Sequence, residues 1–220
     1  MHKEHGGLSG ALGSYPHLFP WRRVPGRGLW GIGVLLLLSI AWGWAHEGAR
    51  HGPSKMVRQR IEGRAPELAL VDQSGQPLTL KDLQGKVVLL TFTYSSCADV
   101  CPLITAAMVA LQQRLTAAER QRVFFLSVTT DPEFDTPAVL HAYANRLGAD
   151  LASWAFLTGP PPVVQEVWQA FGLTVKRGAK GVVDHPTWTL LIDREGIVRY
   201  RYLGSLLEVE TIGEDMRTLW

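Results

Sequence analysis

The segment Lys86–Met108 reads KVVLLTFTYSSCADVCPLITAAM and decides the fold. Its first part, Val87–Tyr94, is an unbroken run of apolar, β-branched and aromatic residues with two threonines, which is typical of a strand buried on both faces in a parallel sheet. From Pro102 to Leu115 the chain places small and apolar residues at helical spacing. The segment is therefore predicted to form a buried strand, a turn and a helix, the unit from which α/β sheets are built.

The turn between that strand and that helix contains both cysteines of the chain, Cys97 and Cys101. Ligands of open α/β sheets bind beyond the carboxyl ends of strands, so this turn is the leading candidate for a functional site. Pro102 favours the first helical position, and the residue before a proline avoids the α region. We therefore expect Cys101 at or near the helix N-cap and Cys97 in the preceding loop, where a helix N-terminus stabilises a thiolate.

The spacing of the pair is C-x3-C, which differs from the C-x2-C of common dithiol redox motifs and lacks the four ligands of a structural zinc site. Two adjacent thiolates form a soft chelate that suits Cu(I). A structural disulfide, or two unconnected buried thiols, is the alternative interpretation of the same residues.

The N-terminal part of the chain divides into three stretches before the expected domain. Residues 1–28 are rich in glycine and proline and predict a disordered tail. Residues 29–45 carry no charge and have tryptophans near both ends, which predicts a transmembrane anchor, with a signal cleaved after Ala45 as the alternative. Residues 46–64 are polar and basic and predict a linker.

Residues 65–220 are expected to form a single domain of ordinary size. Apolar strand patterns alternate with helical patterns and end in a hairpin and a helix. The expected strands are 68–71, 77–80, 87–94, 123–128, 154–157, 187–192 and 197–202, and the expected helices are 102–115, 136–147, 163–171 and 208–220. This order predicts an α/β, thioredoxin-like fold with a central mixed sheet flanked by helices. The formal net charge of +2 gives no indication of a nucleic-acid partner, and we expect none.

Two thiolates leave a metal ion open to a further ligand. Of the histidines beyond the linker, His141 lies beside the expected core stripe of its helix and is predicted to be a surface residue. His185 precedes a strand, in a loop at the sheet edge that is able to approach the cysteine turn. A solvated loop histidine or a strand-end cap is the alternative for His185. Met108 is expected in the core, and Asp131 and Asp184 as outer-sphere acids or as cap and turn residues.

Three motifs together resemble a known family. They are Cys97-x3-Cys101-Pro102, the stretch SVTTDP at 127–132 followed by Asp-Thr-Pro at 135–137, and Asp184-His185 ahead of LLID at 190–193. On these residues the chain from Ala65 to Trp220 resembles the SCO/SenC copper-delivery proteins. One departure is Ala98, where many members of the family have proline.

The resemblance implies a thioredoxin-like domain with a single membrane anchor and a copper ion bound by Cys97, Cys101 and His185. It implies a metallochaperone that helps to assemble the dinuclear copper centre of cytochrome c oxidase. The expected partners are the copper-containing subunit of the oxidase and other copper carriers. The domain would then lie on the periplasmic side of the inner membrane, where disulfides form and the redox state of the thiols matters.

Two enzymatic alternatives use the same cysteines. The first is a thiol-disulfide reductase that keeps the oxidase copper-site cysteines reduced, with Cys97 as the attacking thiol and Cys101 as its partner. The second is a peroxidase, because peroxiredoxins share the fold. The sequence before Cys97 lacks their Pro-x3-Thr-x2-Cys pattern, which argues against the second alternative.

Overall fold

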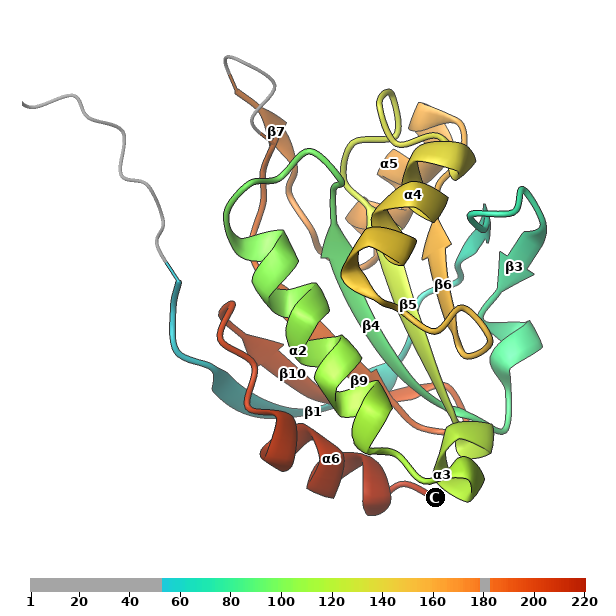
Figure 1. Ribbon diagram of the computed structural model, residues 1–220, viewed down its shortest axis with the longest axis vertical. Coiled ribbons are helices and arrows are strands. Elements are labelled where there is room, and N and C mark those ends of the chain that lie inside the picture. The colour runs from blue at the N-terminus through green and yellow to red at the C-terminus, as the bar shows by residue number, and fades with distance from the viewer. Residues whose placement is uncertain (1–52, 179–182) are drawn as a thin grey trace, which may run out of the picture. The chain divides into compact units, whose positions relative to one another are not determined.

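The computed structural model describes residues 53–178 and 183–220 (Figure 1). The predicted tail, the predicted membrane segment and residues 46–52 of the predicted linker lie outside the described residues. Among the residues described, no helix is both long enough and apolar enough to cross a membrane.

A mixed six-stranded sheet with the order β1-β10-β9-β4-β5-β6 forms the centre of the domain (Figure 1). Its strands are β1 (Val57–Arg64), β4 (Val87–Thr93), β5 (Val123–Thr129), β6 (Trp154–Leu157), β9 (Trp188–Ile192) and β10 (Ile197–Leu203). β4, β5 and β6 run parallel, whereas β4–β9, β9–β10 and β10–β1 are antiparallel pairs. The carboxyl ends of β4 and β5 therefore meet at one edge of the sheet, where loops can form a site.

The central strand β4 is buried on both faces, as its composition predicts. Val87 and Leu89 pack into the core on one face of the sheet, and Val88, Leu90 and Phe92 pack into the core on the other. Apolar residues are needed at successive positions because neighbouring side chains of a strand point to opposite faces.

Helices and a hairpin cover the two faces of this sheet. α2 (Val100–Arg114), α4 (Pro137–Leu147) and α6 (Val209–Arg217) cover one face, to which they contribute Met108, Leu140 and Met216. On the opposite face, Trp168 of α5 (Pro161–Ala170) and Leu70 of the hairpin β2–β3 (Ala69–Val71, Pro77–Thr79) join the second core. This sheet between layers of helices is the α/β, thioredoxin-like architecture that the sequence predicts.

Short elements complete the described chain. They are η1 (Lys81–Leu83), α3 (Ala117–Arg122), β7 (Lys176–Arg177) and β8 (Val183–Asp184). α3 was not predicted from the sequence, although Thr116 and Glu119 form a reciprocal capping box at its start. At α4 the predicted signals are confirmed, because Thr136 caps the helix, Pro137 begins it and Gly148 ends it at φ 78°.

The predicted linker is wrong for residues 57–64, which form the edge strand β1. This strand pairs with β10 in antiparallel register from Val57 opposite Leu203 to Arg64 opposite Ile197. The folded domain therefore begins before the predicted boundary at Ala65. The polar, basic composition that suggested a linker is the composition of an exposed sheet edge, where charged side chains discourage pairing with another chain.

Candidate functional site

The two cysteines lie at the turn between β4 and α2, at the sheet edge where the parallel strands end. α2 begins at Val100 with Asp99 as its N-cap, so Cys101 is the second helical residue and Pro102 the third. The helix thus starts before the predicted position, and Cys101 lies inside its first turn. Proline is tolerated there because the first N–H groups of a helix have no partner within it.

Both thiols are buried and no disulfide joins them. Hydrogen bonding from the Cys101 thiol, and from the backbone amides of Cys101 and Asp99, lowers the pKa of the Cys97 thiol. These donors outweigh burial and lower the pKa of Cys97 to about 5. The same hydrogen bond, together with burial, raises the pKa of Cys101. The pair therefore holds one proton near neutral pH, with the charge on Cys97.

Tyr94, at the end of β4, connects the cysteine turn to the short hairpin β7–β8. Its hydroxyl accepts a hydrogen bond from the Val183 amide at 3.4 Å, and hydrogen bonding from Tyr94 helps to lower the pKa of Cys97. Tyr94, Cys97, Cys101 and Val183 form one small buried cluster. Burial raises the pKa of Tyr94, and the charge of Cys97 adds to this effect, so the phenol keeps its proton.

His185 directly follows β8, and its imidazole lies against the ring of Tyr94 with the centroids 6.2 Å apart. Nδ1 lies 3.1 Å from the carbonyl oxygen of Pro186. Because a carbonyl only accepts, Nδ1 carries the proton and Nε2 of the neutral ring is left with a free electron pair. Burial lowers the pKa of His185, which favours this neutral form. Neutral imidazole is the form that binds metal ions.

The structure brings the two predicted sulfur ligands together in one buried cluster with Tyr94 and places the His185 ring against that tyrosine. Within residues 53–178 and 183–220, no group of three or more His, Cys, Asp and Glu side chains is arranged to hold a metal ion. Two thiols that share a proton and a neutral imidazole nevertheless form a donor set that suits copper. The same thiolate is also chemically able to attack a disulfide.

The remaining predicted residues lie outside the cysteine cluster. His141 is exposed on α4 and hydrogen-bonds to Asn145, and Met108 is buried in the core. Asp184 is exposed on β8. Asp131 is buried and forms an ion pair with Arg177 of β7.

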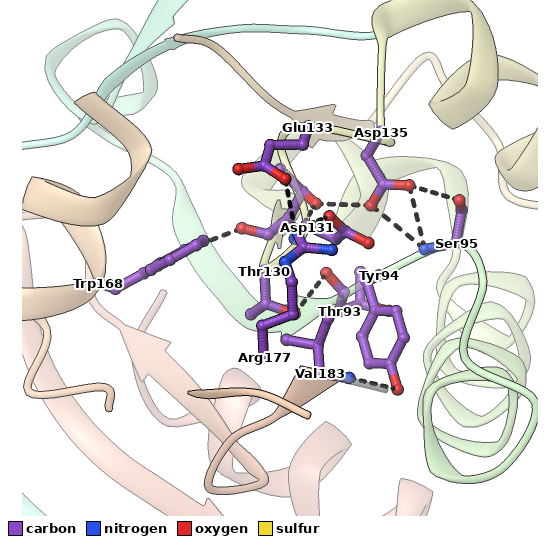
Figure 2. Close-up of polar contacts among 11 residues, drawn as sticks. Thr93, Tyr94, Ser95, Thr130, Asp131, Glu133, Asp135, Trp168, Arg177 and Val183 are labelled. Atoms are coloured by element: carbon purple, nitrogen blue, oxygen red, sulfur yellow. Dashed lines mark hydrogen bonds and ion pairs between the residues drawn. The ribbon is translucent and has the colours of Figure 1, made fainter. Parts of the chain in front are cut away.

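A polar network behind the turn was not predicted from the sequence (Figure 2). The fully buried carboxylate of Asp135 accepts hydrogen bonds from the amide and the hydroxyl of Ser95 and from the Thr129 hydroxyl, the last at 2.5 Å. The Thr130 amide donates to the carbonyl oxygen of Thr93 at 2.8 Å. These bonds join the loops that follow β4 and β5 and fix the backbone from which Cys97 projects.

Among curated proteins, the SCO1 homologue of Bacillus subtilis is 32% identical over 153 residues, which cover 68% of this chain and 79% of that protein. A relative from Stutzerimonas stutzeri is 35% identical over 112 residues, which cover 51% of this chain and 53% of that protein. The chain thus spans about half the length of the second relative.

Two solved structures are similar over most of the domain. ScoI of Bradyrhizobium japonicum with copper bound is 25% identical, with a TM-score of 0.60, and the match covers 72% of this chain and 100% of that one. BsSco, described as a member of the Sco family of cytochrome c oxidase assembly proteins with a disulfide switch, is 26% identical. Its TM-score is 0.63, over 74% of this chain and 96% of that one.

The fold and the dithiol turn define a thioredoxin-like protein whose two free thiols follow the central strand of the sheet. The SCO1/SenC family model matches residues 61–220. The chain belongs to the SCO1/SenC family, which confirms the resemblance seen in the motifs.

Proposed function

We propose that the protein binds a copper ion with Cys97, Cys101 and His185 and delivers it to the dinuclear copper centre of cytochrome c oxidase. The observation that carries this proposal is the buried pair of thiols at the turn, packed against Tyr94, whose ring also contacts the His185 imidazole. Copper bound to ScoI and the description of BsSco as an oxidase assembly protein support the metal and the task.

The protonation states define what each ligand contributes. The Cys97 thiolate is ready to bind the ion, whereas Cys101 must lose its proton, so capture releases a proton. Two thiolates suffice for Cu(I), and Cu(II) gains from the nitrogen of His185. Because the described side chains do not form a three-donor cluster as they stand, the imidazole moves toward the sulfur atoms when the ion binds.

Residues 29–45 would anchor the protein in the inner membrane, with the domain on the periplasmic side. There it would receive copper from other carriers and meet the copper-containing subunit of the oxidase. The uncharged sequence of this segment and its flanking tryptophans support the anchor.

A thiol-disulfide reductase is the second candidate, and the low pKa of Cys97 favours it. The Cys97 thiolate would attack a substrate disulfide and release one substrate thiol. Cys101 would then attack the mixed disulfide, which releases the second thiol and leaves a Cys97–Cys101 disulfide. The substrate gains two electrons and the dithiol loses them.

The experiment that separates the two candidates compares full-length protein in detergent with His185→Ala and with the exposed control His141→Ala. Copper delivery predicts that His185→Ala weakens Cu(II) binding strongly and Cu(I) binding less, while His141→Ala changes neither. Disulfide exchange with a small dithiol should be unaffected. If His185→Ala binds Cu(II) with the wild-type visible thiolate-to-copper band, the three-ligand site is wrong and the reductase is favoured. If the oxidised protein retains stoichiometric copper, the thiolates are not ligands.

A further inference from the structure

The hairpin that precedes His185 is too short to hold its own position. β7 and β8 share only two residue pairs, Lys176–Asp184 and Arg177–Val183. An isolated two-stranded hairpin is marginally stable in water even when it is longer. The place of His185 relative to the thiols therefore depends on contacts between this hairpin and the rest of the domain.

Both strands of the hairpin make polar contacts with the rest of the domain (Figure 2). On β8, the Val183 amide donates to the Tyr94 hydroxyl. On β7, Nη2 of Arg177 lies 2.5 Å from Oδ1 of Asp131 and 3.2 Å from Oε2 of Glu133. The Asp131 side chain is 4% exposed, so this ion pair is sheltered from water on the acidic side. An ion pair with one desolvated partner is screened less than an exposed one.

The loop that receives Arg177 is itself fixed to the cysteine turn. The Asp131 amide donates to the Thr129 hydroxyl at 2.9 Å, and the Asp131 carbonyl accepts from the Asp135 amide at 2.8 Å. Asp135 then accepts from the Ser95 amide, two residues before Cys97. A continuous set of hydrogen bonds thus leads from β7 to the backbone of the turn that carries the thiols.

We propose that Arg177 is a positioning residue, which holds the β7–β8 hairpin so that His185 stays within reach of Cys97 and Cys101. The inference rests on the proposed copper site and deepens it. Arg177 does not touch the ion; by its ion pair with Asp131 it reduces the conformational freedom that the imidazole must lose on binding. A ligand held near its bound position costs less entropy to bind, and this raises the affinity.

The test measures Cu(II) and Cu(I) affinity of the full-length protein in detergent after Arg177→Met. Outer contacts that orient a metal ligand are worth on the order of 10- to 100-fold in metal affinity, so Cu(II) binding should weaken by about tenfold or more. Cu(I), which two thiolates can hold, should change less. Arg177→Lys should restore part of the Cu(II) affinity. Lys176→Met, which removes an exposed charge from the neighbouring position of the same strand, is the matched control and should bind like wild type.

Arg177→Met leaves Asp131 buried without its partner, which could unfold the loop. The double variant Asp131→Asn/Arg177→Met removes both charges and should fold with the same loss of Cu(II) affinity. A double-mutant cycle with His185→Ala isolates the mechanism: Arg177→Met should weaken Cu(II) binding with His185 present and have no further effect without it. If Arg177→Met weakens Cu(II) binding equally with and without His185, the positioning role of Arg177 is wrong. The same holds if folded Arg177 variants bind Cu(II) like wild type. Neither result contradicts the proposed copper site. Wild-type Cu(II) affinity in His185→Ala overturns both the inference and the proposed site.

Discussion

The ring of Tyr94 stands at 73° to the imidazole of His185, with 6.2 Å between the two centroids. The same tyrosine packs with Cys97 in the buried cluster at the turn, and its hydroxyl accepts a hydrogen bond from the Val183 amide. One side chain therefore contacts a proposed sulfur ligand, the strand before the proposed nitrogen ligand, and that nitrogen ligand itself. A substitution at Tyr94 should therefore change the environment of both Cys97 and His185.

Tyr94→Phe keeps the ring beside His185 and removes only the hydroxyl. The pKa of Cys97 should rise from about 5, because the thiolate loses a hydrogen-bond donor. The Val183 amide should exchange with solvent faster, and the free energy of unfolding should fall by about 0.5–1.5 kcal/mol. The pH dependence of Cys97 alkylation and amide hydrogen exchange measure the first two effects. Tyr200→Phe, on β10 outside the cysteine turn, is the control. If Cys97 has the same pKa in wild type and in Tyr94→Phe, the Tyr94 hydroxyl does not hydrogen-bond to the Cys97 thiolate.

The cysteine pair should lose its first proton near pH 5, from Cys97. Alkylation of the reduced protein should therefore remain fast down to about pH 5. Cys101→Ala should raise the pKa of Cys97, because the largest cause of its low value is the thiol hydrogen bond from Cys101. Cys101→Ser keeps a donor and should preserve much of the shift. A profile that is the same in Cys101→Ala and Cys101→Ser would show that the thiol bond has no such effect.

The sign of the accompanying change in stability follows from the two opposite shifts. A cysteine in the unfolded chain has a pKa of about 8.5. The lowered pKa of Cys97 contributes stability that is present above that value and is lost as the pH falls toward about 5. The raised pKa of Cys101 acts in the other direction, and its contribution is lost as the pH rises through the folded value. Urea unfolding of wild type and Cys97→Ala across this range should reveal the first contribution.

The strand β4 and the position of the cysteine turn could be predicted because each depends on a local signal. The apolar run Val87–Thr93 is decisive for a strand buried on both faces, and the two cysteines fall directly after it. The start of α2 was misplaced because Pro102 is compatible with any position in the first helical turn. The family motif suggested His185, but only the fold brings its ring to Tyr94.

Residues whose role depends on a partner far away in the sequence carry no local pattern from which that role could be predicted. The sequence does not indicate that Arg177 pairs with Asp131, 46 residues away, or that Asp135 accepts from Ser95, 40 residues away. β1 was missed because six of its eight residues are exposed and only Val57 and Ile61 are large and apolar, so its alternation of charged with uncharged residues gives a weak strand signal. Its strand character depends on the register with β10, which is a tertiary property.

Asp135→Ala should lower the free energy of unfolding by about 1–3 kcal/mol, because buried donors of Ser95 and Thr129 lose their acceptor. Burial raises the pKa of Asp135, so its titration favours the folded state at low pH and this contribution is lost as the pH rises through the folded value. The deficit of the variant should therefore grow as the pH falls from 7 toward 4. Urea unfolding at both pH values measures this, with exposed Glu166→Ala as control. A deficit independent of pH would be inconsistent with the raised pKa.

Removal of β1 should destabilise the domain, because this strand carries the partner of a buried acid. Arg58 of β1 pairs with Asp215 of α6, whose side chain is 7% exposed and which also accepts from the Tyr202 hydroxyl at 2.7 Å. A protein that begins at Pro53 retains these contacts, whereas one that begins at Ala65 leaves Asp215 without its cation and β10 as a bare sheet edge. Breaking a buried ion pair costs about 3–5 kcal/mol, and the half-exposed arginine makes the cost of this pair smaller. Loss of the whole strand adds to that cost. We therefore expect the protein that begins at Ala65 to have a free energy of unfolding in urea that is lower by at least about 3 kcal/mol. Arg58→Met in the longer protein separates the ion pair from the strand and should account for only part of the loss. Equal unfolding free energies for the two lengths would mean that residues 57–64 are the linker that their composition suggests.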